Sequence, residues 1–226
     1  MTTADTASAT SLSRQRAAWV VVGVLWTAYL IMDATGAAGL SHAAVKALLM
    51  PSLLVWVVLA LGADAPRLLV VGLAFATVGD VGLECDALFL VGMGGFLAMQ
   101  VCYVLGFIDM GAWPNVRRNW TIAAGYLVFW AAANALLGPR LADLRVPILI
   151  YSLALCVMAT FAAGVDRRVG LGGMLFLVSD MLIGVDLADL DLPGRVLIVM
   201  VTYLAAQYLI ATGWARQIDP DVLVPV

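Results

Sequence analysis

The chain has 226 residues, of which 64% are hydrophobic and 12% are charged, and its net charge is −3. Soluble domains contain roughly 45 to 50% apolar and about 25% charged residues, so this chain has too little polar surface to coat a water-soluble globule. The charge balance also lacks the basic footprint of a nucleic-acid-binding protein, which excludes a DNA or RNA partner.

The N-terminal segment differs in composition from the rest of the chain. Residues 1–16 are rich in Thr, Ala and Ser and end with Arg14 and Arg16, which predicts a disordered tail. The apolar stretch that follows is too long for a signal-peptide core and is expected to stay as a membrane anchor. We therefore expect a transmembrane domain over residues 17–215 and a C-terminal tail over residues 216–226.

Eight apolar runs follow one another along the chain. Each is about 20 residues long and lacks strict alternation, which favours membrane-spanning helices over barrel strands. Eight arginines fall on one side of these runs, and three arginines with Lys46 fall on the other, which predicts cytoplasmic N- and C-termini. The predicted fold is all-α, a polytopic membrane bundle of eight transmembrane helices at residues 17–37, 44–62, 66–84, 87–108, 119–137, 145–164, 169–187 and 194–215.

Polar positions recur at matching spacings in the two halves of the chain. Asp80 lies 23 residues before Tyr103, and Asp180 lies 23 residues before Tyr203. This spacing fits two four-helix halves in parallel repeat, related by an axis along the membrane normal. Coincidence is the alternative, because few positions match.

Carboxylates inside apolar runs are the first candidate functional residues, because a charge at membrane depth is costly and tends to be functional. Asp80 and Asp180 lie in the third and seventh runs. Glu84 shares a helix face with Asp80, and the single lysine, Lys46, can reach a carboxylate of a neighbouring helix. Alternatively, Lys46 extends to the membrane interface and Glu84 caps a loop, while Asp180 is a packing carboxyl hydrogen-bonded to a tyrosine.

Uncharged hydrogen-bonding groups also lie within the apolar runs. Gln100 with Tyr103, and Tyr203 with Gln207, stand three and four residues apart, so each pair presents one polar stripe. Tyr151 is a further candidate. A single tyrosine is more often an interfacial anchor, but the group as a whole favours a lined cavity.

Several reaction classes are disfavoured by what the chain lacks. His42 is the sole histidine, which argues against a multi-histidine zinc site, a bis-histidine haem and a Ser-His-Asp triad. The three cysteines, Cys85, Cys102 and Cys156, are widely spaced and fit packing roles. No motif demands a metal or a cofactor, so carboxylate acid/base chemistry remains.

Five short motifs together resemble the YhhN-type lysoplasmalogenases, eight-helix membrane hydrolases of ether lipids. The motifs are Lys46–Pro51 (KALLMP), Gly79-Asp80, Gln100–Tyr103, Ser179-Asp180 and Tyr203–Gln207 (YLAAQ). The resemblance covers roughly residues 20 to 215. The family usually has Lys-Pro where this chain has Lys46-Ala47, and often a histidine where this chain has Gln100.

The resemblance implies hydrolysis of the vinyl ether bond of a lysoplasmalogen, a lysophospholipid, to a fatty aldehyde and glycerophosphoethanolamine or glycerophosphocholine. Such a reaction needs one protonated carboxyl and one carboxylate, for which we expect Asp80 and Asp180. If Lys46 lies near Asp80, Asp80 stays ionised and Asp180 donates the proton, although the assignment is reversible. The expected substrate-binding residues are Lys46, Glu84, Gln100, Tyr103, Tyr151, Ser179, Tyr203 and Gln207.

Three alternatives stay open at this point: a proton-coupled transporter, a hydrolase of another single-chain lipid, and a ligand-sensing or scaffold protein. A transporter is expected to show broken helices near the glycine-rich stretches 92–95 and 170–173, whereas the same glycines also suit close helix packing. The high ratio of arginine to lysine suggests a GC-rich bacterium, and therefore the bacterial cytoplasmic membrane.

Overall fold

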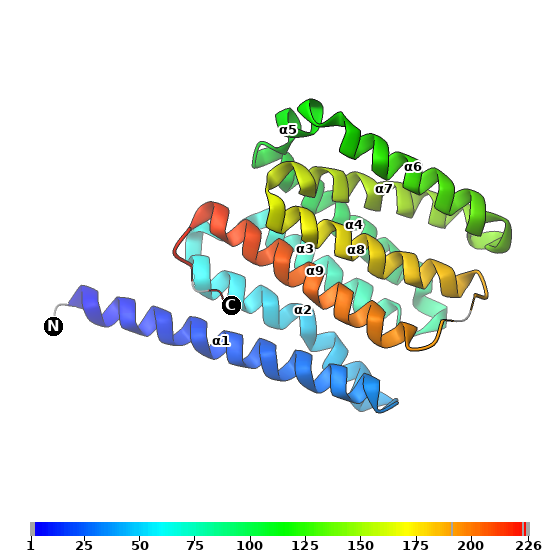
Figure 1. Ribbon diagram of the computed structural model, residues 1–226. Coiled ribbons are helices and arrows are strands. Elements are labelled where there is room, and N and C mark those ends of the chain that lie inside the picture. Colours follow the sequence, from blue (N-terminus) through cyan, green and yellow to red (C-terminus); the bar gives the residue numbers. More distant parts are fainter. Residues whose placement is uncertain (1–2, 191, 223, 225–226) are drawn as a thin grey trace. The chain divides into compact units, whose positions relative to one another are not determined.

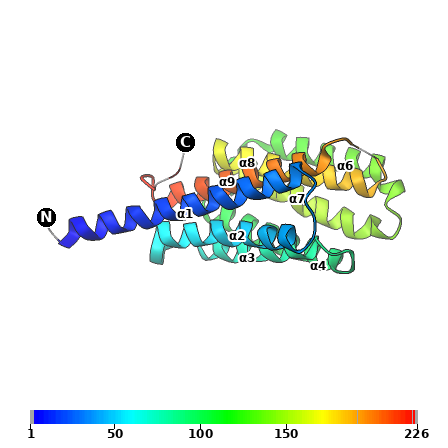
Figure 2. The same ribbon diagram turned by 90° about the horizontal axis from the view of Figure 1, so that it is seen from below.

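A computed structural model describes residues 3–190, 192–222 and 224 of the chain (Figures 1 and 2). Within these residues the regular structure is entirely helical, and no β-strand occurs. Short 3-10 turns connect some of the helices. The α-helices of the described residues are α1 (Thr3–Ala34), α2 (Leu40–Leu61), α3 (Arg67–Gly82), α4 (Phe89–Asp109), α5 (Ala112–Arg118), α6 (Trp120–Leu137), α7 (Arg145–Val165), α8 (Arg167–Leu187) and α9 (Arg195–Ile218).

Each of the eight predicted runs coincides with a long helix, and most ends agree within a few residues. The largest difference is at α1, which begins at Thr3 rather than at residue 17. Residues 3–16 contain several alanines and no glycine or proline, so nothing in them stops a helix. The described residues do not include residues 1–2 of the predicted N-terminal tail or residues 223 and 225–226 of the predicted C-terminal tail. The division of the chain at residues 17 and 215 stays a prediction.

Seven helices are long and apolar enough to cross a membrane, counted over the described residues. They are α1, α2, α4, α6, α7, α8 and α9. The remaining predicted span, α3, has 16 residues, which is shorter than the usual minimum of about 17. The chain is therefore a multi-pass membrane protein, while the count of eight spans and the cytoplasmic location of both termini stay predictions.

The short helix α5 was not expected from the sequence. Gly111 has a left-handed φ of 80°, which suits glycine, and it turns the chain out of α4 into α5. Asn115 of α5 donates from Nδ2 to the carbonyl oxygen of Gly164 on α7 at 2.9 Å. A Cβ at Gly164 would lie 2.8 Å from the carbonyl oxygen of Ala112, so glycine permits this close contact. Because α5 is only seven residues long, hydropathy over a membrane-length window does not reveal it.

The chain forms two compact units, the first made of residues 1–99 and 211–226 and the second of residues 100–210. In the first unit, α2 packs against both α1 and α3. The α3 and α4 backbones meet at Gly82 and Gly92, where a Cβ on Gly82 would lie 2.5 Å from the Cα of Gly92. Small residues at such a crossing let two membrane helices approach closely.

In the second unit, α7 packs against both α6 and α8 (Figure 1). A Cβ on Gly172 of α8 would lie 3.0 Å from the carbonyl oxygen of Ala206, and one on Gly173 would lie 2.7 Å from the Cβ of Ala162. Both glycine-rich helices, α4 and α8, run without a break. Most of these glycines therefore serve close helix packing, with Gly94 an exception, and the broken helices expected of a transporter are not found at either stretch.

The same pattern of side-chain hydrogen bonds occurs in both units. In the first, the indole Nε1 of Trp26 and the Oγ of Ser52 both donate to the carbonyl oxygen of Leu49, at 3.3 Å and 2.6 Å. The second unit repeats these contacts, at 3.3 Å and 3.2 Å, with Trp130, Ser152 and Leu149. The recurrence supports the predicted internal repeat, and the parallel orientation of its halves stays a prediction.

Candidate functional site

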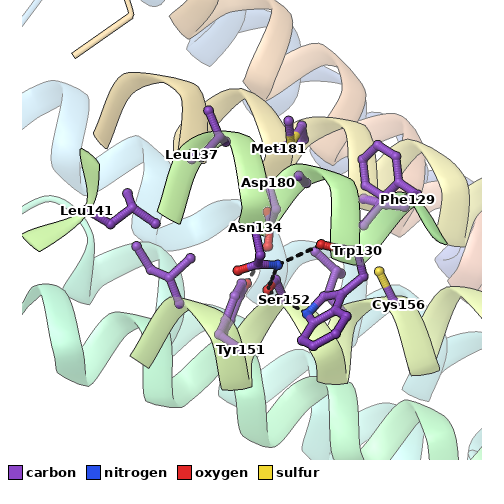
Figure 3. Close-up of a pocket in the computed structure, with 15 residues that line it drawn as sticks. Phe129, Trp130, Asn134, Leu137, Leu141, Tyr151, Ser152, Cys156, Asp180 and Met181 are labelled. Carbon is purple, nitrogen blue, oxygen red and sulfur yellow. Dashed lines mark hydrogen bonds between the residues drawn. The ribbon is translucent and has the colours of Figure 1, made fainter. Parts of the chain in front are cut away.

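An apolar pocket lies among α6, α7 and α8 in the second unit, with an empty volume of about 530 Å³ that includes its open side (Figure 3). Most of its lining consists of Leu, Ile, Phe, Met and Ala side chains. A small number of polar groups join them, as is usual for sites that bind organic molecules. The polar and indole side chains of the lining are Trp130, Asn134, Tyr151, Ser152 and Asp180.

Asp180 supplies the only carboxyl group of this lining. It lies on α8 and accepts a hydrogen bond at Oδ2 from the hydroxyl of Tyr151 on α7 (Figure 3). A carboxyl group inside an apolar helix needs a partner, because leaving it unpaired in low dielectric is costly. The tyrosine partner considered in the sequence analysis is therefore present, and the same carboxyl group also faces a pocket.

A second group of hydrogen bonds joins α6 to α7 beside this pair. Asn134 Nδ2 and Trp130 Nε1 each lie 3.2 Å from the Oγ of Ser152, to which both donate. Figure 3 shows these three side chains meeting on the pocket wall next to Tyr151. The contacts fix α6 relative to α7, and so fix the width of the pocket opposite Asp180.

Gln100 of α4 is fully buried and interacts with the side chain of Tyr151. Neither polar atom of its amide makes a hydrogen bond of good geometry to any described residue. A buried amide without such bonds is unusual, because leaving it unsatisfied costs about 1 to 3 kcal/mol. Gln100 therefore retains hydrogen-bonding capacity next to the Tyr151–Asp180 pair.

Other predicted site residues of this unit hold helices together and do not line the pocket. The hydroxyl of Tyr103 donates to Oε1 of Gln207 at 2.8 Å, which joins α4 to α9 in the buried interior. Ser179 donates to the carbonyl oxygen of Val199 at 3.0 Å. The ring of Tyr203 packs edge-on against Phe176, with ring centres 5.6 Å apart.

The first unit holds a different polar cluster, in which the single lysine has a partner. Lys46 Nζ lies 2.6 Å from Oε1 of Glu84, and the lysine side chain is only 13% exposed. His42 lies between two carboxylates, with Nε2 at 3.7 Å from Asp33 Oδ1 and Nδ1 at 3.8 Å from Glu84 Oε2. The ring of Tyr29 packs on His42, with centroids 4.7 Å apart. The lysine thus reaches a carboxylate on a neighbouring segment, as expected, and that carboxylate is Glu84.

Asp80 of α3 belongs to the same surroundings. It is 2% exposed, and it lies within electrostatic range of Tyr29, as do Asp33 and Glu84. Lys46, Asp80 and Glu84 are therefore members of one cluster in the first unit. The seven other predicted site residues belong to the second unit, and the joint action of Asp80 and Asp180 stays a prediction.

The sequence analysis used His42 only to exclude classes of metal and triad site. Its position four residues before Lys46 places both on one face of α2, and this spacing could have indicated their common cluster. Among the described residues no group of three His, Cys, Asp or Glu side chains is arranged to hold a metal ion.

Comparison with known proteins gives a consistent result. The profile of the YhhN family matches residues 41–214. Lysoplasmalogenase TMEM86B of Homo sapiens is 30% identical over 155 residues, which are 68% of this chain and 66% of the human protein. The rat protein of the same name is 30% identical over 164 residues, 73% of this chain and 68% of its own length. The matches thus span about two thirds of these relatives, and no solved structure matches the chain.

Proposed function

Because the chain belongs to the YhhN family, we propose that it is a membrane hydrolase that cleaves the vinyl ether bond of a lysoplasmalogen. The products are a fatty aldehyde and glycerophosphoethanolamine or glycerophosphocholine. The relatives named lysoplasmalogenase support this reaction. The observation that carries the proposal is the carboxyl group of Asp180, held by Tyr151 on the wall of a mostly apolar pocket.

The chemistry of a vinyl ether suits such a pocket. A protonated carboxyl group gives its proton to the β-carbon of the double bond, and the positive charge that results is shared with the ether oxygen. Water adds to the neighbouring carbon and loses a proton to a carboxylate, which leaves a hemiacetal. The hemiacetal then breaks its original carbon–oxygen bond, so that aldehyde and alcohol leave and one water is consumed.

In this proposal Asp180 is the proton donor to the β-carbon. Its apolar surroundings disfavour the charged form and so favour a protonated carboxyl group before the reaction. Tyr151 orients the carboxyl group through its hydrogen bond to Oδ2. General acid catalysis of this kind contributes typically about 10²- to 10⁴-fold to a rate.

Gln100 has a separate proposed role, as a group that binds the attacking water or a glycerol hydroxyl. Its amide is buried beside Tyr151 and lacks good hydrogen bonds to the described residues, so a polar substrate group would satisfy it. A side-chain amide does not titrate near neutral pH, so it cannot serve as an acid or a base. The proposed role is therefore binding and not acid/base catalysis.

Asp80 is the proposed ionised partner that stabilises the positive intermediate. Lys46 supports an ionised state, because it pairs with Glu84 and reduces the negative charge around Asp80. Lys46 and Glu84 are proposed to act on the substrate head group. Tyr103, Ser179, Tyr203 and Gln207 are proposed to support the site by holding its helices, as their contacts indicate.

The test is aldehyde release by the purified protein in lipid nanodiscs. The substrate is a lysoplasmalogen, and the control lipids are the matching saturated 1-O-alkyl and 1-acyl lysophospholipids. The proposal expects aldehyde from the vinyl ether alone. Release of fatty acid from the 1-acyl lipid, without aldehyde from the vinyl ether, would contradict it and indicate hydrolysis of another single-chain lipid.

A further inference from the structure

A second apolar groove adjoins the candidate site. It lies between α6 and α8 and has an empty volume of about 930 Å³, including its open side. Tyr126 contributes the only phenol of the lining, and no charged side chain takes part. Phe129, Leu177 and Met181 line both this groove and the pocket of Asp180, so the two spaces share a wall.

The packing of the second unit explains why the groove exists. Helices α6 and α8 both pack on α7. The groove is lined by residues of α6 and α8 alone, where these two helices face each other. No residue of α6 is fully buried. Gly125, in the N-terminal third of α6, adds to the opening, because a Cβ built there meets no atom within 4 Å. An apolar groove on the flank of a membrane helix is accessible to lipid chains.

The pocket and the groove together follow α6 over a length comparable to that of a lipid chain. Asp180 and Asn134 lie toward the C-terminal ends of α8 and α6, whereas Ile122 and Met174 lie toward the opposite ends. The rise from Asn134 to Ile122 along α6 is about 18 Å, more than half of a hydrocarbon core of about 30 Å. A single-chain lipid with its polar junction at Asp180 would therefore lay its tail along this groove, past the middle of α6 toward its N-terminal end.

We propose that the α6–α8 groove binds the hydrocarbon chain of the substrate and that Gly125 sets the chain length accepted. The proposal rests on the proposed function, because it takes the polar end of the lipid to be at Asp180. Since the surrounding lipid is as apolar as the groove, selection among chains depends on how well each chain packs in the groove. A large side chain at position 125 displaces the far end of a long chain and leaves a short chain in place.

The first experiment measures binding without turnover, so it does not depend on hydrolysis. Saturated 1-O-alkyl lysophosphatidylethanolamines with chains of 10 and 18 carbons and a diazirine at the chain end are photo-crosslinked to the protein in nanodiscs. In the wild type, the 18-carbon probe is expected to label α6 and α8 near Gly125. For the variant Gly125→Phe, the added ring occupies the path of the long chain, so we expect binding of the 18-carbon lipid to fall about tenfold or more and binding of the 10-carbon lipid to change less than twofold.

Gly94→Phe is the matched control. Gly94 is also an exposed helical glycine with no atom within 4 Å of a Cβ, and it lines neither pocket nor groove. Both substitutions replace a poor helix former, so neither is expected to unfold its helix. The proposal would be overturned if Gly125→Phe weakened binding of the 10-carbon and 18-carbon lipids equally, or weakened neither. Crosslinks confined to helices other than α6 and α8 would also overturn it.

The same variants in the aldehyde assay separate this proposal from the proposed function. A shift of preferred vinyl ether from long to short chains in Gly125→Phe supports both. If the groove binds long saturated chains selectively but no vinyl ether yields aldehyde, the proposal of a chain-binding groove stands and the proposed hydrolase activity is overturned. If Gly125→Phe releases aldehyde with unchanged chain preference and unchanged lipid binding, the proposed hydrolase activity stands and the proposal of a chain-binding groove is overturned.

Discussion

The hydroxyl of Tyr151 donates a hydrogen bond to the carboxyl group of Asp180 on the wall of an apolar pocket. Hydrogen bonds to charged groups contribute about 1.5 to 3 kcal/mol, and this bond becomes one of them as Asp180 gives up its proton. In the account given above, this contact orients a proton donor and does not itself take part in bond breaking.

The variant Tyr151→Phe tests the orienting role. It removes the hydroxyl and keeps the ring, so we expect kcat to fall roughly 10- to 100-fold, with little change in the amount of folded protein. Steady-state aldehyde release gives kcat and KM separately. Tyr208→Phe is a suitable control, because Tyr208 lies 5.3 Å from Arg168 and lines no part of the pocket. Equal losses in both variants would contradict an orienting role specific to Tyr151.

Gln100→Leu tests the binding role of the buried amide. Since the amide makes no good hydrogen bond to described residues, its loss is expected to keep or raise the thermal stability. The activity is expected to fall by about tenfold, mainly through KM, because one substrate hydrogen bond is lost. A large loss of stability would instead show that Gln100 holds the helices together.

The Lys46–Glu84 ion pair is expected to stabilise the first unit. The lysine side chain is 13% exposed and the glutamate 27%, so solvent screens the pair only in part. We expect a coupling energy of about 1 to 2 kcal/mol in a double-mutant cycle with Lys46→Met and Glu84→Gln. The Arg195–Asp186 pair, whose side chains are 20% and 49% exposed, is the comparison and should give less than about 1 kcal/mol. Unfolding in mixed micelles measures both, and a zero coupling for Lys46–Glu84 would refute the prediction.

The crossing of α3 and α4 is expected to tolerate no added methyl group. Gly82→Ala would place a Cβ 2.5 Å from the Cα of Gly92, and overpacking of this kind costs about 1 to 3 kcal/mol. Gly94→Ala, on an open face of the same α4, is expected to be neutral or slightly stabilising. The two melting temperatures check this, and equal values would show that the helices move apart at no cost.

The long helices could be predicted because each is an uninterrupted apolar run bounded by charges or by glycine and proline. The early start of α1 could not, because Ala, Ser and Thr in residues 3–16 suit a disordered tail as well as a helix. A hydropathy profile likewise does not detect α5, because this short helix is positioned by its contact with Gly164 of α7.

The candidate site was predictable only in part. Asp180 and Tyr151 stand out as polar groups in apolar runs, but their pairing depends on how α7 and α8 pack. Trp130 and Ser152 were missed, since a single indole or hydroxyl in such a run usually has a packing role. The sequence also does not distinguish a tyrosine on the pocket wall, such as Tyr151, from one that joins two helices, such as Tyr103.

The most direct test of the central claim is hydrolysis of a lysoplasmalogen in D₂O by the wild type and by Asp180→Asn, with the aldehyde trapped at once by borohydride. The account predicts that wild-type product carries one deuterium on the carbon next to the former aldehyde carbon, and that Asp180→Asn loses about 10²- to 10⁴-fold in rate while remaining folded. Aldehyde formation by Asp180→Asn at the wild-type rate, or product without deuterium at that carbon, would contradict protonation of the double bond by Asp180.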